Sequence, residues 1–275
     1  MIVQFRAWIA LLRPLNVLMF LGGVLLGGLL EGELSALTHP ELWIAALSAT
    51  LIGGAANALN DYFDRETDRI NHPHRPLPAG DLPPAAALRG SLCGFTGGVL
   101  LALLLSPLHV AIAVAAILVL VLYNRWLKHL PLIGNIIVAL TVATSLLYGA
   151  FVISPSTRAS FAALFAFLVM LAREMVKDVE DLPGDLAAHT RTLPALLGPR
   201  RTLQLARTII ILTLFLSVLP YLLGYMYTVY LVGIAVTDLM LLLALDMQNP
   251  SQSSKRLKIG ALLGMLTLAL GSINP

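Results

Sequence analysis

Three oxygen-bearing side chains share one face of a predicted helix in the first third of the chain. Asn60, Asp64 and Asp68 follow one another at intervals of four residues. Each interval carries a helix only about 40° past a full turn, so the three side chains point the same way. Carboxylate and amide oxygens are ligands that Mg²⁺ prefers, with water and phosphate oxygens completing the shell. The spacing therefore indicates a magnesium site, although a solvated helix end with Asp–Arg pairs has the same pattern.

A second acidic segment lies more than a hundred residues further along the chain. Asp178 and Asp181 are three residues apart, so they share a helix face. Asp185 would extend this face, but Pro183 disfavours helical geometry at the residue before it. We therefore expect the helix to end or bend at Pro183, which would leave Asp185 on a loop or a new first turn. A polar helix end without a ligand is the alternative here too.

If the two acidic helix ends meet, their carboxylates repel one another unless cations lie between them. A diphosphate held by Mg²⁺ would meet this requirement, and an apolar tail attached to it would extend among the helices. Metal and basic groups stabilise the charge that develops as diphosphate leaves an allylic carbon. The carbocation character that results requires a pocket without water, and Tyr123 could offer it a π-face.

Basic residues near the acids could complement the phosphate oxygens. For most of them, a role as anchors at the membrane surface is the better interpretation. These residues are Arg65, Arg69, Arg75, Lys128 and Lys177.

The elements that must carry these side chains are membrane-spanning helices. Of the 275 residues, 58% are hydrophobic and 12% are charged, against about 25% charged in an ordinary soluble domain. Mean hydropathy is +0.85. This composition excludes a disordered chain, a nucleic-acid-binding protein and a secreted disulfide scaffold. The single cysteine, Cys93, excludes an intrachain disulfide and a cysteine metal cage.

A bilayer-spanning helix needs roughly 20 mostly apolar residues, and nine segments meet this need. The first eleven residues predict an amphipathic helix at the membrane surface. The predicted spans are residues 14–31, 40–60, 84–105, 107–127, 131–154, 158–178, 203–224, 226–246 and 257–273.

The basic residues provide an independent test of this count. With nine spans, every Lys and Arg except Arg158 falls on one side of the membrane, among 18 in total and a net charge of +3. Because basic residues gather on the cytoplasmic side, we expect the N-terminus in the cytoplasm and the C-terminus outside. Both acidic segments then lie at the cytoplasmic side of the cell (plasma) membrane. Acids close to membrane spans usually serve a function.

Four segments resemble the UbiA superfamily of intramembrane prenyltransferases. The first acidic motif and the segment Asn71–Gly80 resemble its first signature, and residues 178–185 with Arg191–Pro194 resemble its second. The segments at 12–16 and 123–128 resemble its opening stretch and the loop after its fourth helix. The resemblance implies an all-α membrane protein of one domain, residues 1–275, with nine transmembrane helices around a central lipid-facing cavity.

The resemblance also implies roles for individual residues. Asp64, Asp68, Asp181 and Asp185 would be the catalytic carboxylates. With Asn60, the first two would bind one Mg²⁺, and the last two would bind a second, supported by Asp178. Lys128 and Arg69 would contact the diphosphate, beside Arg75, Lys177 and Tyr123, whereas Arg13 and Asn16 would lie near the acceptor.

Within the family, both signatures most resemble the archaeal enzymes of ether-lipid synthesis, which join a geranylgeranyl group to geranylgeranylglyceryl phosphate. A prenyl diphosphate donor, a lipid acceptor and the surrounding membrane lipids are the partners this implies. Chlorophyll synthases and enzymes that prenylate aromatic acceptors such as 4-hydroxybenzoate are alternatives. A transporter that uses carboxylate relays is a remote alternative, because it would place its acids at the bilayer midplane and not at one side of the membrane. A scaffold that binds lipid head groups without turnover is a further alternative. No nucleic-acid partner is expected.

Overall fold

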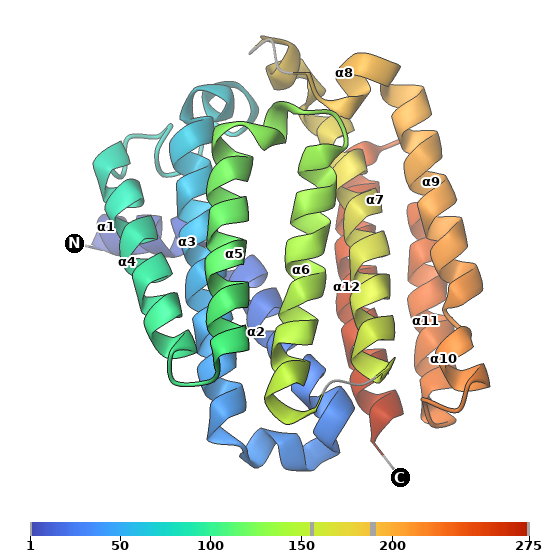
Figure 1. The fold of residues 1–275 in the computed structure, drawn as a ribbon. Coiled ribbons are helices and arrows are strands. Elements are labelled where there is room, and N and C mark those ends of the chain that lie inside the picture. The colour runs from blue at the N-terminus through green and yellow to red at the C-terminus, as the bar shows by residue number, and fades with distance from the viewer. Residues whose placement is uncertain (1, 155–156, 188–190, 274–275) are drawn as a thin grey trace.

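The computed structural model describes residues 2–154, 157–187 and 191–273, and within them all regular structure is helical. Most of the long helices run roughly side by side, whereas the first lies across them (Figure 1). The helices are α1 (Ile2–Leu12), α2 (Pro14–Gly32), η1 (Glu33–Thr38), α3 (Pro40–Asn71), α4 (Pro84–Ala102), α5 (Pro107–Arg125), η2 (Leu127–His129), α6 (Ile133–Ile153), α7 (Thr157–Ala187), α8 (Leu193–Leu197), α9 (Pro199–Leu216), α10 (Leu219–Leu222), α11 (Val229–Ala244) and α12 (Pro250–Ser272).

Proline sets the start of many of these helices. Six long helices, α2, α3, α4, α5, α9 and α12, begin on a proline. A proline at this position costs nothing, because the first turn has no partner for its N–H and the ring already holds a helical φ. The sequence therefore marks these starts directly.

The described helices make this a multi-pass membrane protein. Seven segments are long and apolar enough to cross a bilayer: 14–38, 40–71, 84–102, 107–125, 133–153, 157–187 and 199–222. The predicted span at 203–224 is α9 followed by the short α10. Helix α11 has only 16 residues, and α12 carries three basic residues in its first half. The total of nine spans stays a prediction.

Both helices that carry acidic motifs are longer than the predicted spans. Helix α3 continues to Asn71, so the whole first motif is helical. The predicted helix end at Pro183 is wrong, because α7 continues through it to Ala187 and Asp185 lies within the helix. The Asn71 side chain donates to the backbone oxygen of Asp181 at 3.2 Å. Pro183 removes the helix hydrogen bond to the carbonyl of Val179, and the Asn71 contact is a separate link between the ends of α3 and α7.

Glycine allows the helices in the middle of the bundle to touch backbone to backbone. A Cβ at Gly27 in α2 would lie 1.8 Å from the backbone oxygen of Leu146 in α6. A Cβ at Gly149 would meet the backbone oxygen of Val24 at the same distance. This close packing follows the small-residue rule for helices in lipid.

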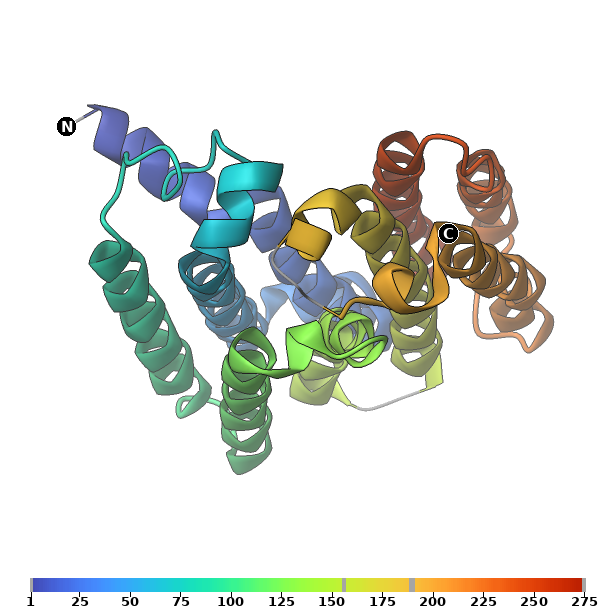
Figure 2. The same cartoon turned by 90° about the horizontal axis from the view of Figure 1, so that it is seen from above.

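The C-terminal ends of α3 and α7 lie at the same end of the bundle, together with α8 and the start of α12 (the upper end in Figure 1). Seen from above, segments from the first, middle and last thirds of the chain converge there (Figure 2). The expected meeting of the two acidic helix ends is therefore confirmed.

Candidate active site

A polar cavity of about 250 Å³ occupies this end of the bundle. Helices α2, α3, α5, α6, α7 and α12 all contribute to its lining. It brings together the side chains of both acidic motifs: Asn60, Asp64, Asp68, Asp178, Asp181 and Asp185.

The first motif is held by hydrogen bonds across its own face. The amide nitrogen of Asn60 donates to Asp64 at 2.8 Å and to Asn124 of α5 at 3.1 Å. The Lys128 ammonium forms an ion pair with the Asp64 carboxylate. Because Lys128 follows α5, this contact fixes the end of that helix against α3.

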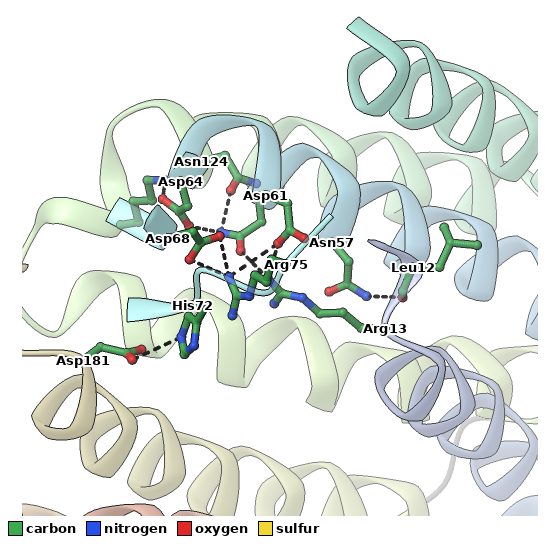
Figure 3. A network of polar contacts seen from close by, with 12 residues as sticks. Leu12, Arg13, Asn57, Asp61, Asp64, Asp68, His72, Arg75, Asn124 and Asp181 are labelled. Carbon is green, nitrogen blue, oxygen red and sulfur yellow. Dashed lines mark hydrogen bonds and ion pairs between the residues drawn. The ribbon is translucent and has the colours of Figure 1, made fainter. Parts of the chain in front are cut away.

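The segment after α3 folds back onto the same face. Nη1 of Arg75 donates to both carboxylate oxygens of Asp68, at 2.7 Å each. It also lies 3.6 Å from Asp61, whose side chain is 2% exposed. Arg13 pairs with this same Asp61 and donates to Asn60 at 3.1 Å. Figure 3 shows the two guanidinium groups next to each other beside the buried carboxylate.

The second motif faces the first across the cavity. Asn135 of α6 donates to Asp178 at 2.7 Å. Asp181 lies 3.4 Å from both the His72 ring nitrogen and the Lys177 ammonium. His72 is the residue that directly follows α3, so the two motifs are in contact through this residue (Figure 3).

Opposite charges are equal in number around the cavity. Its described lining holds six carboxylates, Asp64, Asp68, Glu174, Asp178, Asp181 and Asp185, and six strong cations, Arg13, Arg75, Lys128, Arg173, Lys177 and Lys258. An anion such as a diphosphate therefore enters most favourably together with added positive charge. Among the described residues, no three His, Cys, Asp or Glu side chains converge on one point as a closed metal site.

Most of the sequence-predicted binding residues reach the cavity. Its lining includes Arg13, Asn16, Arg75, Tyr123, Lys128 and Lys177. Arg69 does not: its side chain is 65% exposed and pairs with Glu66 at 2.6 Å. Arg69 directly follows Asp68 on α3. Because adjacent residues of a helix point in different directions, the Arg69 side chain leaves the face that carries Asp68.

Sequence reasoning missed several lining residues, among them His72, Asn124, Arg173, Glu174 and Lys258. A signal existed for Arg173, which precedes Lys177 and Asp181 at intervals of four residues and so shares their helix face. No local signal existed for Lys258, which enters from α12, far along the chain.

Two apolar cavities adjoin the polar one. The first, about 370 Å³, lies among α2, α3, α5 and α6, and shares Phe20 and Leu120 with the polar cavity. The second, about 70 Å³, lies among α2, α6, α7, α9, α11 and α12, and shares Met19 and Met170 with it. Each therefore adjoins the carboxylate-lined space.

Fold and site together define a class: a helical membrane enzyme with a charged reaction chamber at one end of its bundle and apolar space beside it. Residues 16–268 match the model of the UbiA prenyltransferase family. The chain therefore belongs to the UbiA prenyltransferase family and is a prenyltransferase.

Individual relatives are similar to this chain over almost its whole length. A digeranylgeranylglyceryl phosphate synthase of Methanothrix thermoacetophila is 36% identical, over 95% of this chain and 97% of its own length. A solved structure of a digeranylgeranylglyceryl phosphate synthase matches with a TM-score of 0.77 at 29% identity, covering 98% of this chain and 99% of that one. A UbiA homologue from Archaeoglobus fulgidus, bound to GPP and Mg²⁺, matches with a TM-score of 0.72 over 96% and 99% of the two chains. At 17% identity, this last likeness concerns the fold alone.

Proposed function

We propose that this enzyme transfers a geranylgeranyl group from geranylgeranyl diphosphate to geranylgeranylglyceryl phosphate in ether-lipid synthesis. The observation that carries the proposal is the single cavity in which both acidic motifs, a set of cations and two apolar spaces meet. The relatives named for digeranylgeranylglyceryl phosphate synthesis support the choice of acceptor.

The donor set around the cavity fits Mg²⁺ in chemical type. Hard oxygen ligands on both motif helices face one space, and lysine and arginine groups already lie against several of them. In the proposed assignment, Asn60, Asp64 and Asp68 hold one ion, whereas Asp181 and Asp185 hold a second with support from Asp178. When bound, Mg²⁺ neutralises the charge of the departing diphosphate.

The chain's own cations bind and orient the diphosphate in this proposal. Lys128, Arg75 and Lys177 lie next to the carboxylates and exchange these partners for phosphate oxygens when substrate enters. The bond from the allylic carbon to the diphosphate oxygen breaks, and the diphosphate leaves with the electron pair. The acceptor's hydroxyl oxygen then bonds to that carbon, and its proton passes to the departing diphosphate. Tyr123 lines the same space and presents its ring to the electron-poor carbon.

The apolar cavities lie where hydrophobic substrates would extend from the reaction chamber. Each adjoins the chamber from a different side. The larger one, about 370 Å³, can hold an apolar chain beside the chamber, whereas the smaller, about 70 Å³, has room for only part of one. Their apolar walls also exclude water from the developing cation. We propose that the polar cavity and the two apolar cavities together form the predicted central, lipid-facing cavity. They lie within one domain that spans residues 1–275.

The membrane arrangement completes the proposal. Helices α11 and α12 add two spans to the seven that length and composition identify. With nine spans, the excess of basic residues at one side places the N-terminus and the active site at the cytoplasmic face of the plasma membrane and the C-terminus outside.

The test is product analysis with purified protein. Labelled geranylgeranyl diphosphate is supplied with geranylgeranylglyceryl phosphate, 4-hydroxybenzoate and a chlorophyllide acceptor, and products are identified by mass spectrometry. We expect transfer to the glyceryl phosphate alone, loss of transfer with a chelator, and losses of at least about 100-fold in Asp64→Asn and Asp181→Asn. Glu66→Gln, an exposed change on the same helix as Asp64, is the matched control. Transfer to an aromatic acceptor instead would overturn the choice of acceptor.

A further inference from the structure

One side of the polar cavity carries cations that the proposed metal and diphosphate sites do not use. Arg173 comes from α7 and Lys258 from α12, and both line the cavity with Asn16 of α2. Three helices that are distant in the sequence thus place polar side chains in the wall of the chamber.

Lys258 differs from the other cations of the cavity. Its ammonium donates to the Asn16 side-chain oxygen at 3.1 Å. Across the described parts of the chain, the other five Lys and Arg side chains of the lining each have a carboxylate within 4.0 Å, and Lys258 has none. A half-buried ammonium with one neutral partner retains donors for an anion.

Arg173 also retains unused capacity. Its Nη1 donates to Glu174 at 2.5 Å, and its side chain is 16% exposed. Its Nε is fully buried and has no hydrogen-bond partner among the described residues. A buried donor without a partner is costly, and an acceptor oxygen brought by a ligand would remove that cost.

The electrostatic balance in this part of the cavity favours an anion. Arg173 and Arg13 line the cavity together with Lys258, and Glu174 lies against Arg173. Arg13 is committed to the buried Asp61, and Glu174 pairs with Arg173. A bound phosphate would compensate this local excess of positive charge.

We propose that Lys258 and Arg173, together with the Asn16 amide, bind the phosphate monoester of the acceptor, apart from the diphosphate held at the two acidic motifs. This inference rests on the proposed function. A glyceryl phosphate anchored here would present its hydroxyl to the chamber while its chain extends into an adjoining apolar cavity. The subsite then selects a phosphorylated acceptor over the corresponding alcohol.

Steady-state kinetics on Lys258→Met and Arg173→Gln tests this proposal. We expect the KM for geranylgeranylglyceryl phosphate to rise at least about tenfold in each variant, because each loses a charged hydrogen bond. The KM for the donor should change less than about twofold, which also shows that the variants fold. The preference for the phosphorylated acceptor over geranylgeranylglycerol should fall by a similar factor. Lys255→Met, an exposed change on the same helix, is the control and should match the parent protein.

A second measurement uses the unaltered enzyme. Glycerol phosphate should inhibit competitively against the lipid acceptor and not against the donor. An unchanged acceptor KM in both variants, or a raised donor KM, would overturn this assignment while leaving the proposed function intact. If the unaltered enzyme transfers nothing to the phosphorylated acceptor, the proposed function itself fails.

Discussion

The ring nitrogen of His72 lies 3.4 Å from the carboxylate of Asp181. His72 immediately follows the helix that carries the first acidic motif, and Asp181 belongs to the second motif. The two motifs are therefore one unit, and the segment that joins α3 to α4 lies against the end of α7. Changes at this junction are expected to affect both motifs together.

Gly184 lies against the end of the other motif helix. A Cβ at this position would lie 2.2 Å from the Asn71 side-chain oxygen, so Gly184→Ala must displace the Asn71 side chain and disturb its hydrogen bond to Asp181. We expect a loss of about 1–3 kcal/mol in unfolding free energy and a donor KM raised about tenfold, measured by thermal unfolding in detergent and by transfer kinetics. Gly97→Ala is the control, because its nearest neighbour is the flexible end of Leu51 at 3.2 Å. Unaltered kinetics in Gly184→Ala would mean that the junction does not hold the motifs.

Asp61 is a positioning residue beneath the first motif. Its side chain is 2% exposed and contacts both Arg13 and Arg75. Because Asp61→Ala leaves two guanidinium groups without this partner, we expect a loss of about 3–5 kcal/mol in unfolding free energy. Glu66→Ala, which removes an exposed pair from the same helix, should cost less than about 1 kcal/mol. Denaturation in detergent micelles compares the two, and equal losses would contradict the role of Asp61.

Lys128 is expected to act on the donor and not on the acceptor. Its side chain is 9% exposed and pairs with Asp64, next to the proposed diphosphate position. Lys128→Met should raise the donor KM about 10- to 100-fold, because a charged hydrogen bond to phosphate is lost. The acceptor KM should stay within about twofold. Arg125→Met, an exposed change at the end of α5, three residues before Lys128, is the control. If Lys128→Met raises the acceptor KM instead, the assignment of Lys128 to the donor site is wrong, and the donor and acceptor sites must be reversed.

The balanced charge of the cavity predicts that diphosphate and metal bind together. Inorganic diphosphate with Mg²⁺ should raise the thermal unfolding temperature, because a ligand that binds only the folded state stabilises it. Diphosphate with a chelator should give at most a small shift, since the anion would enter a cavity whose charges already balance. Equal shifts with and without Mg²⁺ would show that the chain's own cations suffice.

The spacing of the motifs determined which side chains share a helix face. Asn60, Asp64 and Asp68 line the cavity together, as their interval of four residues requires. The positions of the prolines fixed many helix starts, and composition placed the chain in a membrane. These features are local, so a linear sequence contains them completely.

Tertiary structure decided which faces meet and which side chains remain outside. Helix α7 continues past Pro183, and its end contacts Asn71 of α3, a contact that no local rule contains. Arg69 lies outside the cavity and Arg75 inside, because the segment after α3 folds back towards Asp61 and Asp68. Lys258 reaches Asn16 across 242 positions of sequence. Such meetings depend on the packing of whole helices, and the energy that selects them is spread over many contacts distant in the chain.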